Sequence, residues 1–155
     1  MAETPRFLVG IDFSAGSRKA LVEARRLAAR CGALLTLAHV RPFSDVRAAI
    51  KEERGDLVRA GGRVLSREIA AHYASRLGGW ANEAAGERTL LLRGAPDVAL
   101  TREARRGYML LVLGTHGTNV VSEILLGSTV ERALARSSIP VLAVPARPRR
   151  PRSAR

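Results

Sequence analysis

The sequence predicts an α/β protein in which an open parallel sheet carries helices on both faces. Short apolar runs alternate along the 155 residues with longer segments of helical periodicity. Strand-to-helix-to-strand crossovers of this kind are right-handed and join parallel strands. Hydrophobic residues make up 46% of the chain but aromatic residues only 4%, so the core must be aliphatic, as in proteins of this class. The length fits one domain.

Five apolar runs are the predicted strands. The first, "RFLVGI", is rich in β-forming residues and is broken by the turn sequence "DFSAGS". The second, "ALLTLAHV", is apolar at nearly every position, which predicts burial on both faces. The remaining runs are "RTLLLRG", "YMLLVLG" and "IPVLAVP", and the strands are expected at 6–11, 33–40, 88–94, 108–114 and 139–145.

Helices are expected between these strands. Apolar residues recur at helical spacing from Ser17 to Cys31, and Gly32 follows where a C-terminal cap belongs. Partial helix is predicted over 41–62. A second helix follows over 64–77, and Gly78–Gly79 either end it or kink it before Trp80. A short helix begins at Pro96, where a missing N–H costs little, and another spans 128–137.

The net charge of +12 raises the possibility of a nucleic-acid partner. The final nine residues, "RPRRPRSAR", carry five arginines, and the other charges are spread over helix-like segments. We expect a folded domain over 1–146 and a solvated, disordered tail over 147–155. The alternative is a tail that binds nucleic acid or another acidic partner.

The sequence also indicates the compartment. A single cysteine, Cys31, excludes an intrachain disulfide and predicts a reducing environment, with Cys31 as a small structural residue. No signal peptide precedes Phe7 and no apolar run is long enough to span a bilayer, so we expect a cytoplasmic protein. His39 and His72 lack metal-ligand spacing, so no metal site built from protein ligands is expected.

A binding site is predicted where the first and fourth strands end. Ligands of open parallel sheets bind beyond the carboxyl ends of the strands, where the strand order reverses. These two strands end in "GIDFS" and "GTHG". If the two strands are neighbours, Asp12 and Gly114 face one crevice.

The segment "LGTHGTNVVSEILLGST", residues 113–129, suggests what this crevice binds. Ser128 and Glu131 match a capping box, so a helix is expected to begin at Gly127–Ser128 and to offer free N–H groups to an anion. Glycines at 114, 117 and 127 would let the backbone approach phosphates. Ordinary turn formation and helix capping remain the alternative. The segment matches neither the P-loop pattern nor the dinucleotide fingerprint.

Together these segments resemble the universal stress protein family from about Arg6 to Val144. The family's nucleotide motif is G-x2-G-x9-G-[ST], and Gly114, Gly117, Gly127 and Ser128 have that spacing. "LVGIDFSAGSRKAL", "LTLAHV" and "IPVLAVP" are similar to its first, second and last strands. The resemblance implies a parallel sheet of order 3-2-1-4-5, ATP binding, and a homodimer formed through the strand from Ile139 to Pro145.

The resemblance also assigns site residues. It implies that Ile11 and Asp12 meet the adenosine part of ATP and that Val40 lines the adenine pocket. It implies that Leu113 and Gly114 approach the ribose and α-phosphate. The phosphates would be held by Gly117, Gly127, Ser128 and Thr129.

The sequence departs from the family pattern at two positions. Thr118 stands where many members carry Lys or Arg, and residues 114–129 contain no basic side chain. Backbone amides, a helix end, a divalent cation such as Mg²⁺ or a distant arginine must then meet the phosphate charge. Met109 replaces an acid at the start of the fourth strand, away from the site. His116 is expected to shape the loop, and the alternative is a phosphate contact or an acid–base group.

The expected function is that of an ATP-binding universal stress protein, a nucleotide-dependent regulator with at most weak ATPase activity. Rapid hydrolysis needs a positioned water, a base and charge stabilisation, and the loop supplies no obvious base. One alternative is a hydrolase or phosphotransferase on the same fold. The other is a nucleotide-free dimeric scaffold that binds partners through its surface or its basic tail.

Overall fold

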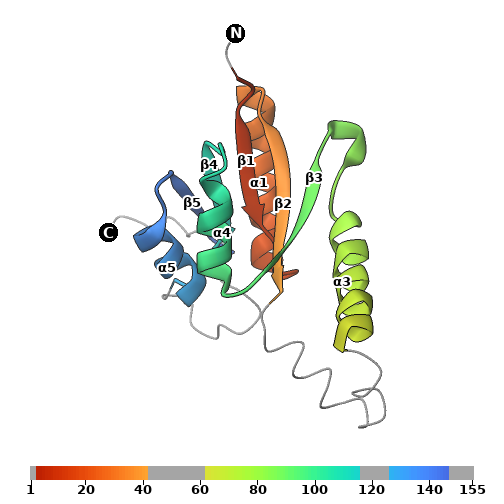
Figure 1. Cartoon of the computed structure of the whole chain (residues 1–155). Coiled ribbons are helices and arrows are strands. Elements are labelled where there is room, and N and C mark those ends of the chain that lie inside the picture. Colours follow the sequence, from red (N-terminus) through yellow and green to blue (C-terminus); the bar gives the residue numbers. More distant parts are fainter. Residues whose placement is uncertain (1–2, 42–61, 116–125, 147–155) are drawn as a thin grey trace, which may run out of the picture.

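The computed structural model of the chain describes residues 3–41, 62–115 and 126–146 (Figure 1). Its centre is a five-stranded parallel sheet of order β3-β2-β1-β4-β5, which confirms the predicted order. The strands are β1 (Arg6–Gly10), β2 (Leu34–Arg41), β3 (Arg88–Arg93), β4 (Leu110–Gly114) and β5 (Val141–Val144).

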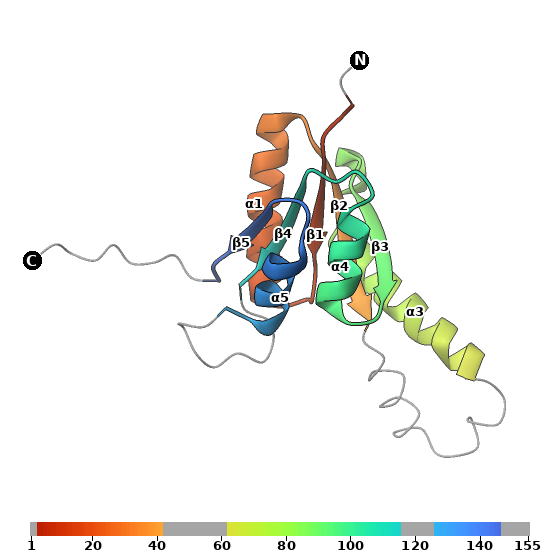
Figure 2. The same cartoon turned by 60° about the vertical axis from the view of Figure 1, so that its left-hand side comes forward.

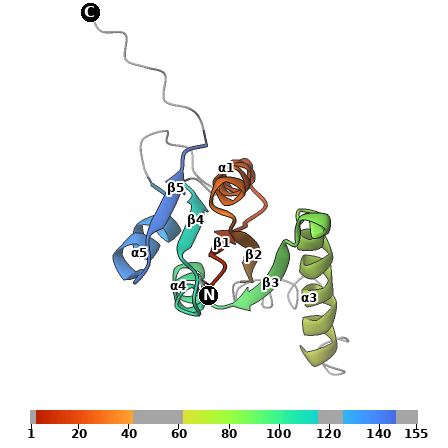
Figure 3. The ribbon, with the colours of Figure 1, turned by 90° about the horizontal axis from the view of Figure 1, so that it is seen from above.

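The helices are α1 (Ala15–Cys31), α3 (Gly62–Gly78), α4 (Pro96–Ala104) and α5 (Ser128–Arg136), with a 3₁₀ turn η1 (Glu83–Ala85). Figures 1 and 3 show α4 and α5 on one face of the sheet and α1 on the other, with α3 beside β3. The helix predicted after the first strand begins at Ala15, two residues before Ser17, because the Ser14 side chain caps it by accepting from the Ser17 N–H. Of the segment 41–62, where partial helix is predicted, Arg41 ends β2 and Gly62 begins α3, and residues 42–61 lie outside the described residues.

Two apolar layers hold the sheet between the helices. Phe7 and Val9 of β1 pack with Leu21 of α1, and Leu77 of α3 belongs to this same layer. Leu8 of β1 packs with side chains of α4 and α5 on the opposite face. Every residue of β2 after Leu34 is buried, so the predicted burial on both faces is confirmed.

Several expected bounds change in detail. The first strand ends at Gly10 rather than at residue 11, the fifth spans Val141–Val144 rather than 139–145, and α3 begins at Gly62 rather than at residue 64. The fourth strand begins at Leu110 rather than Tyr108, because the Tyr108 N–H donates to the Ala104 carbonyl at the end of α4. Cys31 ends α1 as expected, but its side chain is exposed, so it does not help to build the core. Gly32 caps α1 with a left-handed φ of 64°, as the sequence predicts.

The ends of the helices carry a regular charge pattern. The last turns of α1, α3, α4 and α5 contain Arg30, Arg76, Arg102 and Arg136 respectively, where a cation meets the negative end of the helix dipole. Among the described residues no helix is long and apolar enough to cross a membrane.

Candidate functional site

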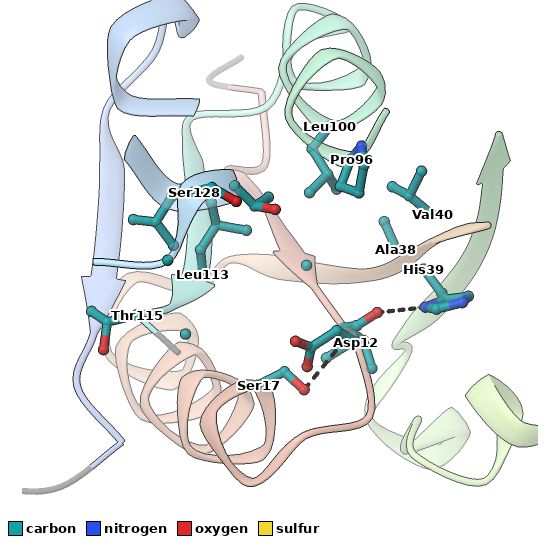
Figure 4. Close-up of a pocket in the computed structure, with 16 residues that line it drawn as sticks. Asp12, Ser17, Ala38, His39, Val40, Pro96, Leu100, Leu113, Thr115 and Ser128 are labelled. Carbon is teal, nitrogen blue, oxygen red and sulfur yellow. Dashed lines mark hydrogen bonds between the residues drawn. The ribbon is translucent and has the colours of Figure 1, made fainter. Parts of the chain in front are cut away.

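The carboxyl ends of β1 and β4 open into one pocket. The two strands are parallel neighbours, with Val9 opposite Val112, so the chain segments that follow them begin side by side. The pocket between them has a volume of about 260 Å³ (Figure 4). Eight of the nine predicted site residues line it: Ile11, Asp12, Val40, Leu113, Gly114, Gly127, Ser128 and Thr129. Gly117, together with His116 and Thr118, lies outside the described residues.

Several lining residues were not singled out from the sequence. They are Gly10, Ser17, Ala38, His39, Pro96, Leu100, Thr115 and Val130. Most of them stand next to a residue that was singled out or belong to the first turns of α1, α4 and α5. Their positions could have been found by extending each strand end and helix start by one turn.

A compact turn fixes Asp12 at the edge of the pocket. The Asp12 carboxylate accepts hydrogen bonds from the Ser14 N–H at 2.9 Å and from the Ser14 hydroxyl at 2.5 Å. The Ser14 hydroxyl oxygen in turn accepts from the Ser17 N–H at 3.1 Å and so caps α1. The residue that faces the pocket therefore also organises the start of the helix behind it.

The glycines that face the pocket have a packing role of their own. A Cβ at Gly114 would lie 2.6 Å from the carbonyl carbon of Gly16 and 2.9 Å from the Ser17 nitrogen. A Cβ at Gly127 would lie 3.1 Å from the Thr115 carbonyl oxygen, to which the Gly127 N–H donates at 2.7 Å. Contact within the chain thus explains both glycines, whether or not a ligand is bound.

The predicted capping box does not form. Gly127, not Ser128, is the N-cap of α5, and no side chain caps the helix; Ser128 is its first residue. A glycine N-cap leaves the first N–H groups of the helix without an intramolecular acceptor from a side chain. Because Ser128 and Thr129 line the pocket, the positive end of α5 opens into it.

His39 connects the pocket to the face of the sheet that α1 covers. Its Nδ1 lies 2.7 Å from the Ile11 carbonyl oxygen, and since a carbonyl only accepts, Nδ1 carries the proton (Figure 4). The side chain is buried in the last part of β2, one residue before Val40. The sequence predicted its burial but not this bond to the backbone of the neighbouring loop.

The charge of the described pocket lining comes from Asp12 alone. No lysine or arginine is among the described lining residues. The described part of the chain also contains no group of three or more His, Cys, Asp or Glu side chains that could hold a metal ion. Within the described lining, the start of α5 is the part that suits an anion.

A second cavity, of about 280 Å³, lies at the opposite edge of the sheet, where Arg6, Arg88 and Glu103 line it. The amino ends of the strands and the carboxyl ends of the helices face this edge, so the helix dipoles there disfavour an anion. Met109 is exposed near the same edge, away from the first pocket. The pocket at the carboxyl edge is therefore the better candidate site.

Comparison with known proteins agrees with this architecture. The structure is similar to that of the hypothetical protein MJ0577, with a TM-score of 0.76, 21% identity, and coverage of 95% of this chain and 99% of that chain. It is similar to the universal stress protein UspA from Lactobacillus plantarum, with a TM-score of 0.64 and 22% identity. That match covers 93% of this chain and 99% of that chain.

It is also similar to a universal stress protein in complex with cAMP, with a TM-score of 0.60 and 25% identity. That match covers 94% of this chain and 100% of that chain. No protein with a curated description matches the chain. The profile of the universal stress protein family matches residues 3–145, which is nearly the whole described chain. The chain therefore belongs to the universal stress protein family.

Proposed function

We propose that this chain binds an adenine nucleotide, ATP in the first place, in the pocket at the carboxyl edge, and acts as a nucleotide-dependent stress regulator. The observation that carries the proposal is the start of α5, which brings Gly127, Ser128 and Thr129 to the same pocket as Asp12 and Gly114. The likeness to a universal stress protein in complex with cAMP supports a nucleotide as the ligand class.

The lining divides into an apolar part and a backbone-rich part. Ile11, Val40 and Leu100 present aliphatic side chains that suit the faces of an adenine ring. Ser128 and Thr129 present the first N–H groups of α5, which suit phosphate oxygens. In this proposal Asp12 lies beside the adenosine part, where its carboxylate can accept a hydrogen bond from a sugar hydroxyl.

The phosphate charge then depends on a cation from solution. No basic side chain lines the described pocket, and the dipole of one helix balances only about half of an elementary charge. ATP in cells carries Mg²⁺, which prefers phosphate oxygens and water to an all-protein cage. We therefore propose ATP·Mg²⁺ as the bound form.

Regulation is favoured over catalysis because the described lining offers one titratable acid and no lysine or arginine to stabilise a transferred phosphoryl group. We expect at most slow hydrolysis. A hydrolase would show rapid single-turnover cleavage of ATP that the Asp12→Ala variant abolishes, and that result would contradict the regulatory assignment.

The test is isothermal titration of the purified chain with ATP·Mg²⁺, ATP in excess EDTA, and adenosine, together with mass analysis of any nucleotide that co-purifies. We expect ATP·Mg²⁺ to bind, ATP in EDTA to bind at least several-fold more weakly, and adenosine to be unaffected by EDTA. Absence of binding by all three at high protein concentration would contradict the proposal and favour a nucleotide-free scaffold.

The remaining parts of the assignment are also proposals. We infer a homodimer formed through β5, a cytoplasmic location, and a folded domain over 1–146 followed by a basic tail.

The tail, residues 147–155, lies outside the described residues. If the tail binds nucleic acid, binding should weaken with salt and be lost when the chain ends at residue 146; unchanged binding would contradict that role.

A further inference from the structure

Aromatic side chains gather beside the pocket in a chain that has few of them. Phe13, Tyr73 and Trp80 are half of the chain's aromatic residues. Phe13 and Tyr73 contact the ring of His39, and Trp80 contacts Phe13. The Phe13 ring centroid lies 4.6 Å from that of His39 and 5.6 Å from that of Trp80. Tyr73 stacks on His39 at 4.7 Å. We call these four residues the aromatic cluster.

Phe13 has an uncommon backbone conformation. Its φ is 64°, and it is the only non-glycine residue with a positive φ in the described part of the chain. A bulky side chain rarely adopts this left-handed conformation unless its surroundings hold it there. Here the ring contacts those of His39 and Trp80, and the Arg76 guanidinium lies over it at 4.1 Å.

The aromatic cluster supports one wall of the pocket from behind. Phe13 directly follows Asp12, and His39 bonds to the Ile11 carbonyl through Nδ1. Ile11, Asp12 and His39 line the pocket, whereas Phe13 and Tyr73 do not. Contacts that hold the Phe13 ring therefore also restrain the backbone next to the Asp12 carboxylate.

Two members of the cluster come from α3 and the turn after it. Among the α3 side chains that the structure describes, only Leu77 is buried, and Figures 2 and 3 show the start of the helix standing away from the sheet. Tyr73 lies one turn before Leu77, at the end of the helix that contacts the sheet. Through Tyr73, the aromatic cluster thus joins α3 to the pocket wall.

We propose that Phe13 is a positioning residue for nucleotide binding, and that the docking of α3 on Phe13 and His39 sets the affinity of the pocket. The inference rests on the proposed function, because the affinity concerned is that for an adenine nucleotide. Binding and docking are then coupled in both directions: a ligand that contacts Asp12 and Ile11 tightens α3, and loss of the α3 contacts weakens the ligand.

The first experiment is calorimetric titration of variants with adenosine, which avoids the phosphate part of the site. Tyr73→Leu removes a ring that does not touch the pocket and should weaken binding by about 5-fold or more, the lower range of measured couplings between sites. Tyr73→Phe keeps the stacked ring and should bind like the wild type. Ser75→Ala, an exposed position on the same helix, is the matched control.

A second pair of variants separates the ring of Phe13 from its backbone. Phe13→Ala and Phe13→Gly both lose the ring contacts, but glycine adopts a positive φ without strain and alanine does not. We expect Phe13→Ala to bind more weakly than Phe13→Gly, and both to bind more weakly than the wild type. Circular dichroism of each variant reports whether the fold is retained.

The wild-type chain supplies an independent readout. Trp80 is its single tryptophan and lies in edge contact with Phe13, so its fluorescence reports on the aromatic cluster. We expect the emission of Trp80 to change on saturation with adenosine in the wild type and in Ser75→Ala.

The outcomes separate this inference from the proposed function. Binding by the wild type with no change in Trp80 emission, and with Tyr73→Leu and Phe13→Ala as tight as Ser75→Ala, would overturn the inference and leave the nucleotide site standing. A wild-type chain that binds neither adenosine nor ATP·Mg²⁺ would overturn both. Weakened binding by Tyr73→Leu with wild-type binding by Tyr73→Phe would support the inference.

Discussion

Gly114, the first glycine of the G-x2-G-x9-G-[ST] motif, is required by the packing of α1 on β4. Its Cα faces the backbone of Gly16 and Ser17, so a side chain there would meet main-chain atoms that cannot rotate away. We predict that Gly114→Ala lowers the free energy of unfolding by about 1–3 kcal/mol, the usual cost of overpacking. Urea denaturation followed by circular dichroism measures the change.

Gly78→Ala is the matched control, because a Cβ at Gly78 would meet no atom within 4 Å. Gly127→Ala should fall between the two, since its Cβ would approach one carbonyl oxygen at 3.1 Å and its φ of −62° suits any residue. If Gly114→Ala were as stable as Gly78→Ala, the packing explanation would be wrong.

The start of α5 is the element on which phosphate binding depends. Ser128 is exposed and is the first residue of the helix, where an acidic side chain stabilises the helix dipole. Ser128→Asp should therefore keep or raise stability while repelling phosphates. We predict at least about 10-fold weaker binding of ATP·Mg²⁺, measured by calorimetry, with adenosine binding nearly unchanged.

Ser128→Asn is nearly the same size as Ser128→Asp but carries no charge, so it isolates the electrostatic effect. It should bind ATP·Mg²⁺ within a few-fold of the wild type. If Ser128→Asp weakened the binding of ATP·Mg²⁺ and of adenosine equally, α5 would not face the phosphates.

A bidentate ion pair joins α1 to the segment between α3 and β3. Arg25 Nε and Nη2 donate to the two Glu87 oxygens at 2.7 Å and 2.8 Å, and Nη2 also donates to the Trp80 carbonyl. Burial raises the pKa of Glu87, but hydrogen bonds from Arg25 and the Asn82 N–H lower it more, so the net pKa lies below its ordinary value of 4.5. The ion pair therefore stabilises the ionised carboxylate.

This pKa shift predicts the pH dependence of stability. A depressed folded pKa gives stability that is present above the unfolded pKa and is lost as pH falls through the folded pKa. We predict that Glu87→Gln lowers the free energy of unfolding by about 1–3 kcal/mol at pH 7. The difference in this free energy between the variant and the wild type should shrink below about pH 4.5. Thermal melts from pH 7 to pH 3 measure it.

Glu23→Gln is the control for that experiment. Glu23 pairs with Arg26 on the exposed surface of α1, where an ion pair contributes little. Its effect should stay within about 0.5 kcal/mol at every pH. A pH-independent cost for Glu87→Gln would mean that packing, rather than the charge of Glu87, stabilises this contact.

At the scale of the whole molecule, β5 is the open edge of the described sheet next to β4. The Pro140 carbonyl accepts from the Leu111 N–H, and the Val144 carbonyl accepts from the Thr115 N–H. Successive residues of a strand point their backbone groups to opposite sides, so the N–H of Ala143 faces away from β4. If the proposed homodimer pairs through this edge, Ala143→Pro should convert it to monomer without loss of the fold. Light scattering coupled to size-exclusion chromatography gives the mass.

Ala143→Val is the control, since it adds similar bulk and keeps the N–H. It should remain dimeric. A wild-type chain that elutes as a monomer at high concentration would contradict the proposed dimer, and a dimer that persists in Ala143→Pro would place its interface elsewhere.

Local patterns in the sequence were enough to predict most of the fold. The apolar runs located all five strands because a buried parallel strand has nearly continuous apolarity, and Gly32 located the end of α1 because its φ requires glycine. The order of the strands came from the family resemblance rather than from any local pattern, since which strands pair is decided by contacts far apart in sequence.

The site could be predicted as a set of positions but not as a set of contacts. The spacing of Gly114, Gly127 and Ser128 placed them at one pocket, yet the approach of Gly114 to Gly16 depends on how α1 packs on β4. The capping box failed because Gly127 takes the cap position and bonds to Thr115. The support of Asp12 by α3 depends on rings about 60 residues away in the chain, which no local pattern reveals.

The net charge of +12 has a kinetic consequence for a pocket whose described lining contains no lysine or arginine. The positive charge of the whole chain attracts an anionic nucleotide from a distance, before any contact with the pocket forms. Added salt should therefore slow the association of ATP, whereas its dissociation, governed by backbone contacts, should change little. The association rate of the nucleotide would then depend on the charge of the whole chain, and its dissociation rate on the contacts within the pocket.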